Sequence, residues 1–511
     1  MTKSMIHWIN KWKDKMELSQ NPQSEKQKIK KRIHENSTLL KKAFANSSDV
    51  VISPISIGSN RQVKALIVYI SGIVDMNQLD EHLLKPLHNK NISTNLNLID
   101  IKNTINIANI KEISTFTSIF NEVSSGHSVL IIDSFSIALA IDLTKWQTRS
   151  VEEPSSETVI RGPKESFNES LQTNTSLLRK RIRTPKLKIK QIHSGSYSQT
   201  PIAISYIDGI ADPCLVDEVM TRIKKISIDA IFDSGSIQEF IQDSKWSIFP
   251  TIFSTERPDT ASAALFEGRV AIIVDGSPHT LILPSTFFMF FSSPDDYYSG
   301  FIIGTALRLL RIFYLMIAQF GPSIYVAITT FHQEMIPTTL LFSITQAREQ
   351  VPFPSVFEAI IMEITFEALR EASIRLPRPV GPAISIVGAL VIGQAAIQAS
   401  LVSPLMVIVV SITAIASFMI PHYEASNAIR ILRFPIIVFA SLCGLLGIII
   451  SFITILIHLC TLRSFGQPYM EPLAPFKKAS WIDSLVRGPI WKMNQRPHLT
   501  GTTWNCKKSK Q

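Results

Sequence analysis

Cysteine is scarce in this sequence, with four residues in a chain of 511. The cysteines lie far apart and include no C-x-x-C pair, so they support neither a zinc site nor a disulfide framework. A reducing compartment is the simpler interpretation. The four positions are Cys214, Cys443, Cys460 and Cys506.

Motifs typical of catalytic and phosphate-binding sites are also missing. The chain has no G-x-x-x-x-G-K-S/T or G-x-G-x-x-G sequence. "TTFHQEMIP" contains His332 and Glu334 but lacks the second His of an H-E-x-x-H zinc helix, so a structural or gating role is favoured. "VDGSPH" holds Asp275, Ser277 and His279, yet side chains of one hairpin cannot converge as a catalytic triad must. We therefore expect no enzyme, no cofactor and no metal site.

Charge is low and unevenly spread. Lys, Arg, Asp and Glu make up 18% of the chain, against 46% hydrophobic residues and a mean hydropathy of +0.19. Charged residues nearly vanish from several windows after residue 300, and a bilayer core requires roughly 20 apolar residues. Four windows are candidate spans: Ile312 to Phe331, Ala383 to Val402, the short Leu405 to Ile420, and Ile436 to Ile457. The sequence thus joins a soluble half to a membrane half.

The flanking charges predict the orientation. We expect no cleavable secretory signal at the N-terminus, and basic residues predominate both there and after the last span. By the positive-inside rule both ends are cytoplasmic, which requires an even number of crossings, and four fits. The window after Pro404 is short enough to form a helical hairpin with its predecessor instead, which leaves the topology open.

The soluble half is predicted to contain two α/β subdomains. In the first, residues 63–75 form a strand, 76–87 a helix, and 128–144 two strands broken at Ser134. In the second, residues 165–183 form a helix, 202–212 a strand and turn, and 213–226 a helix beginning at Pro213. A helix then stops near Gly268, and two strands meet at Asp275-Gly276.

The predicted fold class is α+β with a membrane part: two cytoplasmic α/β subdomains, then an α-helical transmembrane domain of about four spans plus amphipathic helices. The predicted boundaries are 1–46 for a disordered basic tail, 47–160 and 161–295 for the subdomains, 296–465 for the transmembrane domain, and 466–511 for a basic cytoplasmic tail.

The formal charge of +10 raises the possibility of nucleic-acid binding, with "RKRIRTPKLKIK", Arg179 to Lys190, as its best support. In a membrane protein, a solvated linker or a face near anionic lipid headgroups explains such a run better. We expect no nucleic-acid partner.

Residues 384–402 carry features of a pore-lining helix. Val387, Val391, Gln394 and Gln398 fall on one face at spacings of three and four. Glutamines inside a span should face protein or water rather than lipid, and small residues on the other faces allow close helix contact. Val391 would form an apolar constriction. Alternatively, the glutamines hydrogen-bond to a neighbouring helix in a packed bundle, and the residues alone favour this second interpretation.

The segment "EAIIMEITFEALREASIRLPRPVG", Glu358 to Gly381, reads as an amphipathic helix. Glu363, Glu367 and Glu371 share a stripe, which suits the membrane interface or a pore vestibule where a ring of carboxylates attracts cations. The competing explanation is intrahelical pairing, Glu367 with Arg370 and Glu371 with Arg375. Catalysis is the weakest interpretation, because no cleft or matched partner is visible.

Several motifs together resemble the A subunit of the spore germinant receptors, the GerA family, in order from about Asp49 to Pro497. They are "STERPD", "EGRVAIIVDGSP", "FHQEMIPTTLLFSITQAREQVPFP", "EITFEALREASIRLP" and "QPYMEPLAPF". The resemblance implies a multi-pass protein of the inner endospore membrane, working with a transporter-like B subunit and a lipoprotein C subunit. In that family the A subunit is thought to form a homo-oligomer around an ion-conducting pore.

With the resemblance, the pore interpretation becomes the favoured one, and His332 and Glu334 join the three glutamates as candidate vestibule or gating residues. The alternative is a membrane signalling or scaffold subunit whose spans form a sealed bundle. A secondary transporter is a poorer choice, because no inverted repeat is detected.

Overall fold

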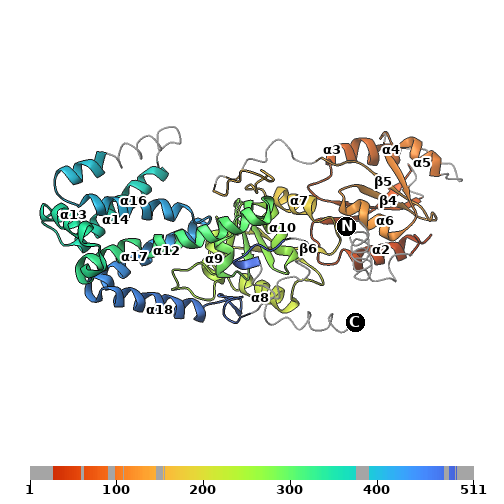
Figure 1. Ribbon diagram of the computed structural model, residues 1–511. Coiled ribbons are helices and arrows are strands. Elements are labelled where there is room, and N and C mark those ends of the chain that lie inside the picture. Colours follow the sequence, from red (N-terminus) through yellow and green to blue (C-terminus); the bar gives the residue numbers. More distant parts are fainter. Residues whose placement is uncertain are drawn as a thin grey trace, which may run out of the picture. The chain divides into compact units, whose positions relative to one another are not determined.

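The computed structural model describes residues 27–58, 63–89, 98–107, 109–145, 154, 156–375, 391–476, 483–489 and 491. Two compact units make up the chain (Figure 1). The first comprises the chain up to Pro154, Lys164–Ile241 and Ser254–Ile282. The second comprises Ser155–Pro163, Gln242–Phe253 and the chain from Leu283 onward.

The first unit begins with an antiparallel sheet in the order β1-β2-β4-β5-β3. Its strands are β1 (Val50–Ile57), β2 (Val63–Ile70), β3 (Ile110–Ile113), β4 (Ser128–Ile132) and β5 (Ala138–Ile141). Its helices are α2 (Ile33–Ala43), α3 (Met76–Gln78), the π-helical η1 (Leu79–Leu84), α4 (Lys85–Asn89), α5 (Leu98–Thr104) and α6 (Phe116–Ser124). The predicted strands and the break at Ser134, where φ is 72°, are confirmed.

The same arrangement recurs further along the first unit, as a sheet in the order β6-β7-β9-β10-β8. Its strands are β6 (Leu187–Ser194), β7 (Thr200–Ile207), β8 (Phe253–Thr255), β9 (Val270–Val274) and β10 (Thr280–Leu283). Its helices are α7 (Leu171–Arg181), α8 (Pro213–Lys224), α9 (Ser234–Ile241) and α10 (Pro258–Phe266). Because strand order and helix placement match, the two sheets are copies of one fold, which we call repeat 1 and repeat 2. The sequence predicts two α/β subdomains but not that they share one fold.

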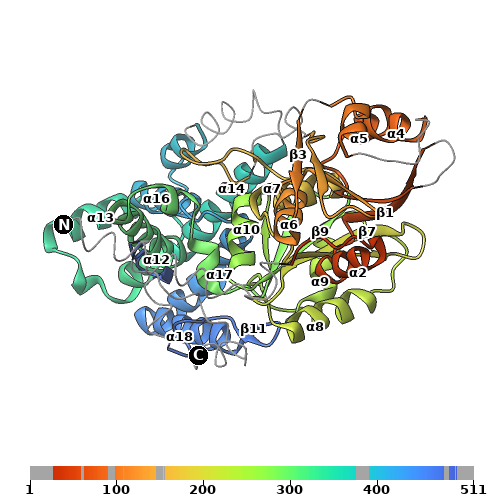
Figure 2. The same cartoon turned by 90° about the vertical axis from the view of Figure 1, so that its right-hand side faces the viewer.

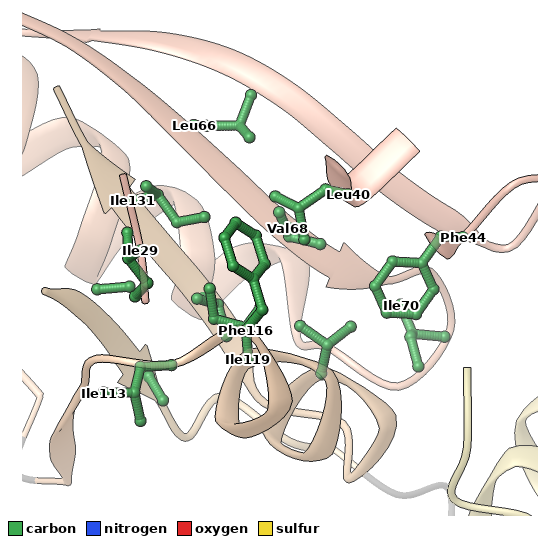
Figure 3. Packing of buried hydrophobic residues seen from close by; sticks show 14 of the residues in the cluster. Ile29, Leu40, Phe44, Leu66, Val68, Ile70, Ile113, Phe116, Ile119 and Ile131 are labelled. Carbon is green, nitrogen blue, oxygen red and sulfur yellow. The ribbon is translucent and has the colours of Figure 1, made fainter. Parts of the chain in front are cut away.

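Strand β2 shows why the sheet of repeat 1 forms a two-sided layer. Successive side chains of a strand point to opposite faces. Leu66, Val68 and Ile70 join a cluster with residues of α2 and α6 (Figure 3). The intervening Ala65, Ile67 and Tyr69 join a second cluster with residues of η1, α4 and α5. Both faces of the strand are therefore buried, which accounts for its continuous apolar run.

One hydrogen-bond pattern anchors the first helix of each repeat. In repeat 1, Asn36 accepts from the Lys30 amide at 3.0 Å and donates to the Lys30 carbonyl at 2.6 Å. In repeat 2, Asn174 does the same with Asn168, at 2.8 and 2.6 Å. Both asparagines are fully buried, so each satisfies backbone groups that water cannot reach.

A second pair of equivalent contacts joins these helices to the sheets. Asp133, after β4, accepts from the Ile33 amide at 2.9 Å, and Asp275, after β9, accepts from the Leu171 amide at 2.9 Å. Each carboxylate thereby satisfies an amide at the start of a helix, where intrahelical partners are lacking. Asp275 of the "VDGSPH" segment is therefore a structural residue of the repeat.

The basic run of residues 179–190 lies in α7 and β6 and joins the two repeats. Arg179 donates to both carboxylate oxygens of Asp49, at 2.7 and 2.9 Å, and to the Thr184 carbonyl. Lys188 donates to the Ala43 carbonyl at 2.7 Å, and its burial lowers the pKa of its ammonium group. The favoured prediction of a solvated linker is wrong for these two buried residues, because the fold supplies their partners.

The second unit is mainly helical. Its long helices are α12 (Phe301–Phe331), α13 (Thr338–Glu349), α14 (Ser355–Arg375), α16 (Pro404–Phe418), α17 (Tyr423–Cys443) and α18 (Leu445–Thr461), and residues 391–398 are helical. Shorter elements are η2 (Phe287–Phe291), α11 (Asp295–Tyr298), η3 (Gln333–Met335), β11 (Arg463–Ser464) and β12 (Gln467–Pro468). Helices α12, α16 and α17 lie side by side (Figure 1, Figure 2).

Among the residues that the structure describes, the helices α12 and α17 are long and apolar enough to cross a bilayer, whereas α16 and α18 are apolar but shorter. The predicted span Ile436 to Ile457 is wrong as one helix. Gly444 interrupts it with a φ of +61°, and a Cβ there would lie 2.7 Å from His332 Cε1. This turn lets α18 fold back along α17, with which it is in contact.

Candidate functional site

The candidate pore residues lie on the helical segment 391–398. Val391, Gln394 and Gln398 are exposed in the single chain. The neighbouring Gly393 is buried, and a Cβ there would lie 3.8 Å from Val407 of α16. This segment therefore packs on α16 through a glycine while its glutamine face stays open. Val387 lies outside the described residues, so the full stripe stays a prediction.

Two acidic residues of α14, Glu363 and Glu367, have partners on α17. Glu363 and Arg433 form an ion pair of 2.5 Å, with both side chains at most 3% exposed. One turn further along α14, Glu367 lies 3.1 Å from the Nε atom of Arg430. Residues 363 and 367 thus face residues 433 and 430 in order, as two antiparallel helices in contact allow.

Glu371 differs from the other two carboxylates. It pairs with Arg375 of its own helix at 2.6 Å, and both side chains are exposed. The predicted intrahelical pair is confirmed here, whereas Glu367 takes Arg430 in place of the predicted Arg370. The side chain of Arg370 instead donates to the Ser417 hydroxyl at 2.6 Å and lies over the Phe418 ring.

The arginines of α17 are functional candidates that sequence reasoning missed. Their signal was "RILR", two arginines three residues apart at Arg430 and Arg433 and immediately before an apolar window. Arg433 also donates to the Ala318 carbonyl of α12 at 2.8 Å. Buried charges between apolar helices are expensive unless paired, so these contacts tie α12, α14 and α17 together.

A second polar cluster joins α12, α14 and the start of α16. The fully buried Glu358 accepts from the Ser403 amide at 2.8 Å, at the N-terminus of α16. The Tyr325 and Ser403 hydroxyls are 3.4 Å apart, and those of Thr329 and Ser355 are 3.1 Å apart. A carboxylate at a helix N-terminus is favoured by the helix dipole and by its free amides.

A third cluster lies at the opposite end of α12. The buried Asp296 of α11 pairs with Arg308, at 3.1 Å, and with Arg311. Arg311 donates to the Phe291 carbonyl at 2.6 Å, and Arg308 lies 3.6 Å from an oxygen of Asp483. The two arginines at the start of the apolar helix are thereby neutralised and held in place.

His332 and Glu334 lie at the far end of α12, apart from the α14–α17 ion pairs. His332 is half-buried, with its Nδ1 atom 3.5 Å from the Ala327 carbonyl. Glu334 is exposed in the short η3 turn. The structure brings neither residue to Glu363, so their gating role stays a prediction.

The residues of "VDGSPH" do not assemble into a catalytic triad. The Ser277 hydroxyl donates to Asp233, whereas the His279 ring lies 3.5 Å from Glu256. Within the described ranges, no group of three or more His, Cys, Asp and Glu side chains is arranged to hold a metal ion.

Comparison with known proteins identifies the family. Residues 38–499 match the family described as Bacillus/Clostridium GerA spore germination protein. Spore germination protein KA of Bacillus subtilis (strain 168) is 46% identical over 459 residues, covering 89% of this chain and 84% of that protein. Spore germination protein GerLA of Bacillus cereus is 37% identical over 90% of this chain and 94% of its own length.

Two further similarities involve a membrane protein and a solved structure. The uncharacterized membrane protein YfkQ of B. subtilis is 43% identical over 91% of this chain and 90% of that protein. The crystal structure of the N-terminal domain of the A subunit of the Bacillus megaterium spore germinant receptor GerK3 is 34% identical. It covers 51% of this chain and 98% of that one, with a TM-score of 0.42. From the match over most of its length, the chain belongs to the GerA family of spore germination proteins.

Proposed function

We propose that this chain is the A subunit of a nutrient germinant receptor and forms a homo-oligomer around a germinant-gated, cation-permeable pore. It works in the inner membrane of the endospore with a transporter-like B subunit and a lipoprotein C subunit, and its N-terminal half is cytoplasmic. Membership of the family and its relatives named as spore germination proteins support the germination role.

The observation that carries the pore proposal is the two-sided character of residues 391–398. A glycine faces α16, while Val391, Gln394 and Gln398 are exposed. Glutamines facing lipid are costly, so an oligomer that turns this face toward a central water-filled axis removes the cost. Val391 then narrows the pore as an apolar ring that excludes water when closed.

The ion pairs modify the proposed roles of the α14 carboxylates. Arginines of α17 form ion pairs with Glu363 and Glu367, so we assign these two carboxylates the role of holding α14 in the helical bundle. Glu371 is exposed, and its ion pair with the exposed Arg375 is weak enough in water to leave the carboxylate able to attract cations at a vestibule. A ring of these carboxylates would raise the local cation concentration without contacting a permeating ion directly.

Ion flux through liposomes containing the chain and its partner subunits tests the proposal. Val391→Ala should raise the basal cation leak because it widens the apolar ring. Ile392→Ala removes the same kind of apolar volume from the next position of the same helix and should leave the leak unchanged. No flux from wild type or either variant, despite verified assembly and germinant binding, would favour the non-conducting alternative.

That alternative is a sealed signalling or scaffold subunit, and the extensive pairing within the bundle is the observation in its favour. Cysteine substitution separates the two functions. Water-accessible thiols at 391, 394 and 398 but not at the buried position 393 support the channel. Uniform protection along the segment supports the sealed bundle.

A further inference from the structure

The loop between α9 and β8 holds the side chain of Trp246 away from the protein. Trp246 is 98% exposed, although hydrogen bonds hold the loop on either side of it. Asp243 accepts from the Gly466 amide at 3.4 Å, and the Ser247 hydroxyl lies 3.1 Å from Nε2 of His458 in the last turn of α18. Tryptophan is highly buried on average, so a fully exposed one is a candidate contact residue where it extends a larger apolar surface.

The loop continues an apolar surface that runs along α18. One stripe of that helix exposes residues at helical spacing, namely Leu446, Ile449, Ile450, Ile453, Leu456 and Ile457. The stripe ends next to His458, the residue that contacts Ser247. Ile248, on the same loop, is also partly exposed. Trp246 therefore lies near the end of the exposed apolar stripe of α18, on a loop that also carries polar side chains.

The length of α18 fits this position. With 17 residues the helix spans about 25 Å, whereas the hydrocarbon core of a bilayer is about 30 Å thick. A helix shorter than the hydrocarbon core needs flanking residues that are stable in the headgroup region, so that the helix and its flanks together span the thickness of the bilayer. Tryptophan is the side chain enriched there, because its ring is apolar and its N–H donates to the headgroup region. The adjacent Lys245 is exposed and suits anionic headgroups.

We propose that the loop of residues 243–248 is a lipid-contacting anchor, in which Trp246 enters the headgroup layer at the cytoplasmic end of α18. The proposal rests on the membrane location proposed above for the helical unit. The occupant of this surface is the bilayer rather than a protein, since the surface is continuous with the lipid-facing stripe of α18. The anchor fixes the depth and tilt of α18, and hence of α17 packed against it.

Depth-dependent fluorescence quenching of the full chain in liposomes tests the anchor. The fluorophore is attached to single cysteines at Trp246→Cys, Ile449→Cys or Tyr197→Cys, after the native Cys214, Cys443, Cys460 and Cys506 are replaced by serine. Ile449 represents the middle of the stripe, and Tyr197 is an exposed residue of the first unit. Quenchers are a spin label at the lipid headgroup, a spin label deep in the acyl chain, and aqueous iodide.

The expected result is that the headgroup label quenches the probe at 246 several-fold more than iodide does, the acyl label quenches the probe at 449, and iodide quenches the probe at 197. Iodide quenching at 246 equal to that at 197, with 449 still in lipid, would overturn the anchor alone. Shielding of 246 from all three quenchers would also overturn it and indicate a protein partner. Iodide quenching at 449 would instead contradict the membrane location itself.

A conservative variant supplies a second measurement that does not depend on labelling. In wild-type chains reconstituted with brominated lipids, part of the intrinsic tryptophan fluorescence should be quenched, and Trp246→Phe should lose a quenchable component. Trp491→Phe is a matched control, because Trp491 is also exposed but packs against Phe301 at the start of α12. Equal quenchable fractions in wild type and Trp246→Phe would count against the anchor.

Discussion

The guanidinium of Arg433 on α17 lies 2.5 Å from the carboxylate of Glu363 on α14, and both side chains are almost completely buried. The second oxygen of Glu363 and the Nη2 atom of Arg433 are buried without a hydrogen-bond partner. The pair is thus desolvated but incompletely satisfied. Such a pair contributes little net stability, yet removing one partner leaves an isolated buried charge.

We therefore predict that Arg433→Met destabilises the helical unit by about 3–5 kcal/mol, since Glu363 loses its counter-charge. Glu363→Leu should do the same. The double variant should recover most of the loss, because two apolar side chains replace the pair. Unfolding of the detergent-solubilised chain, followed by circular dichroism in a double-mutant cycle, measures the coupling. If the losses in free energy of unfolding simply add in the double variant, the two side chains do not stabilise each other.

Glu371→Gln provides the matched control for that cycle. Its ion pair with Arg375 is exposed at both ends. An exposed pair one turn apart on a helix contributes only about 0.3–0.5 kcal/mol. The substitution should therefore leave the unfolding transition nearly unchanged while lowering cation flux if Glu371 lines a vestibule.

The Arg179–Asp49 contact predicts how the two repeats depend on each other. Arg179→Met leaves the carboxylate of Asp49 without its two donors, so we expect a loss of about 3 kcal/mol in the free energy of unfolding. Arg179→Lys should recover only part of it, because a single ammonium cannot reproduce the planar double contact. Hydrogen exchange should accelerate in β1 and β6 together. The exposed Arg183→Met is the control.

The buried asparagines predict equal effects in the two repeats. Asn36→Asp and Asn174→Asp each replace an amide donor by a carboxylate oxygen facing a backbone carbonyl. Each change should cost at least about 1–3 kcal/mol, the penalty for an unsatisfied buried polar group. Amide exchange should rise in α2 for the first variant and in α7 for the second. An effect in one repeat only would argue against equivalent roles.

His422 predicts a pH dependence of stability. Its ring packs against Phe253, with ring centroids 4.5 Å apart, just before α17 begins. Burial, with a smaller contribution from Arg311, lowers the pKa of His422 to about 4 from an ordinary 6.5. Between these two values the unfolded chain binds a proton that the folded chain does not, so stability should fall as the pH falls through this window, by about 3 kcal/mol in total.

Thermal unfolding of the solubilised chain between pH 7.5 and pH 4.5 checks this expectation. His422→Phe removes the titrating group from an aromatic environment and should flatten the pH dependence in that range. His279→Asn is the control, because the His279 side chain is far more exposed than that of His422. If His422→Phe keeps the full loss of stability at low pH, other titrating groups cause that loss. Glu157, whose carboxylate lies 3.8 Å from His422, would be the first of these to test.

Local sequence patterns determined most of the elements, because their causes lie within a few residues. The apolar run of β2, the Pro213 start of α8 and the turn at Asp275-Gly276 each follow from alternation, φ restriction or turn chemistry. Helix α12 continues through Pro322, since a long apolar helix packed on its neighbours tolerates one missing hydrogen bond. The motifs were also sufficient to indicate the family.

Only the tertiary structure decided which distant residues meet. The duplication of the two sheets, the burial of Arg179 and the break of a uniform apolar window at Gly444 all depend on long-range contacts. The same holds for Glu367, which takes a partner on α17 where its own helix offered Arg370. Composition places carboxylates and arginines on helices, but burial and helix packing select the pairs, because an unpaired buried charge costs far more than an exposed one.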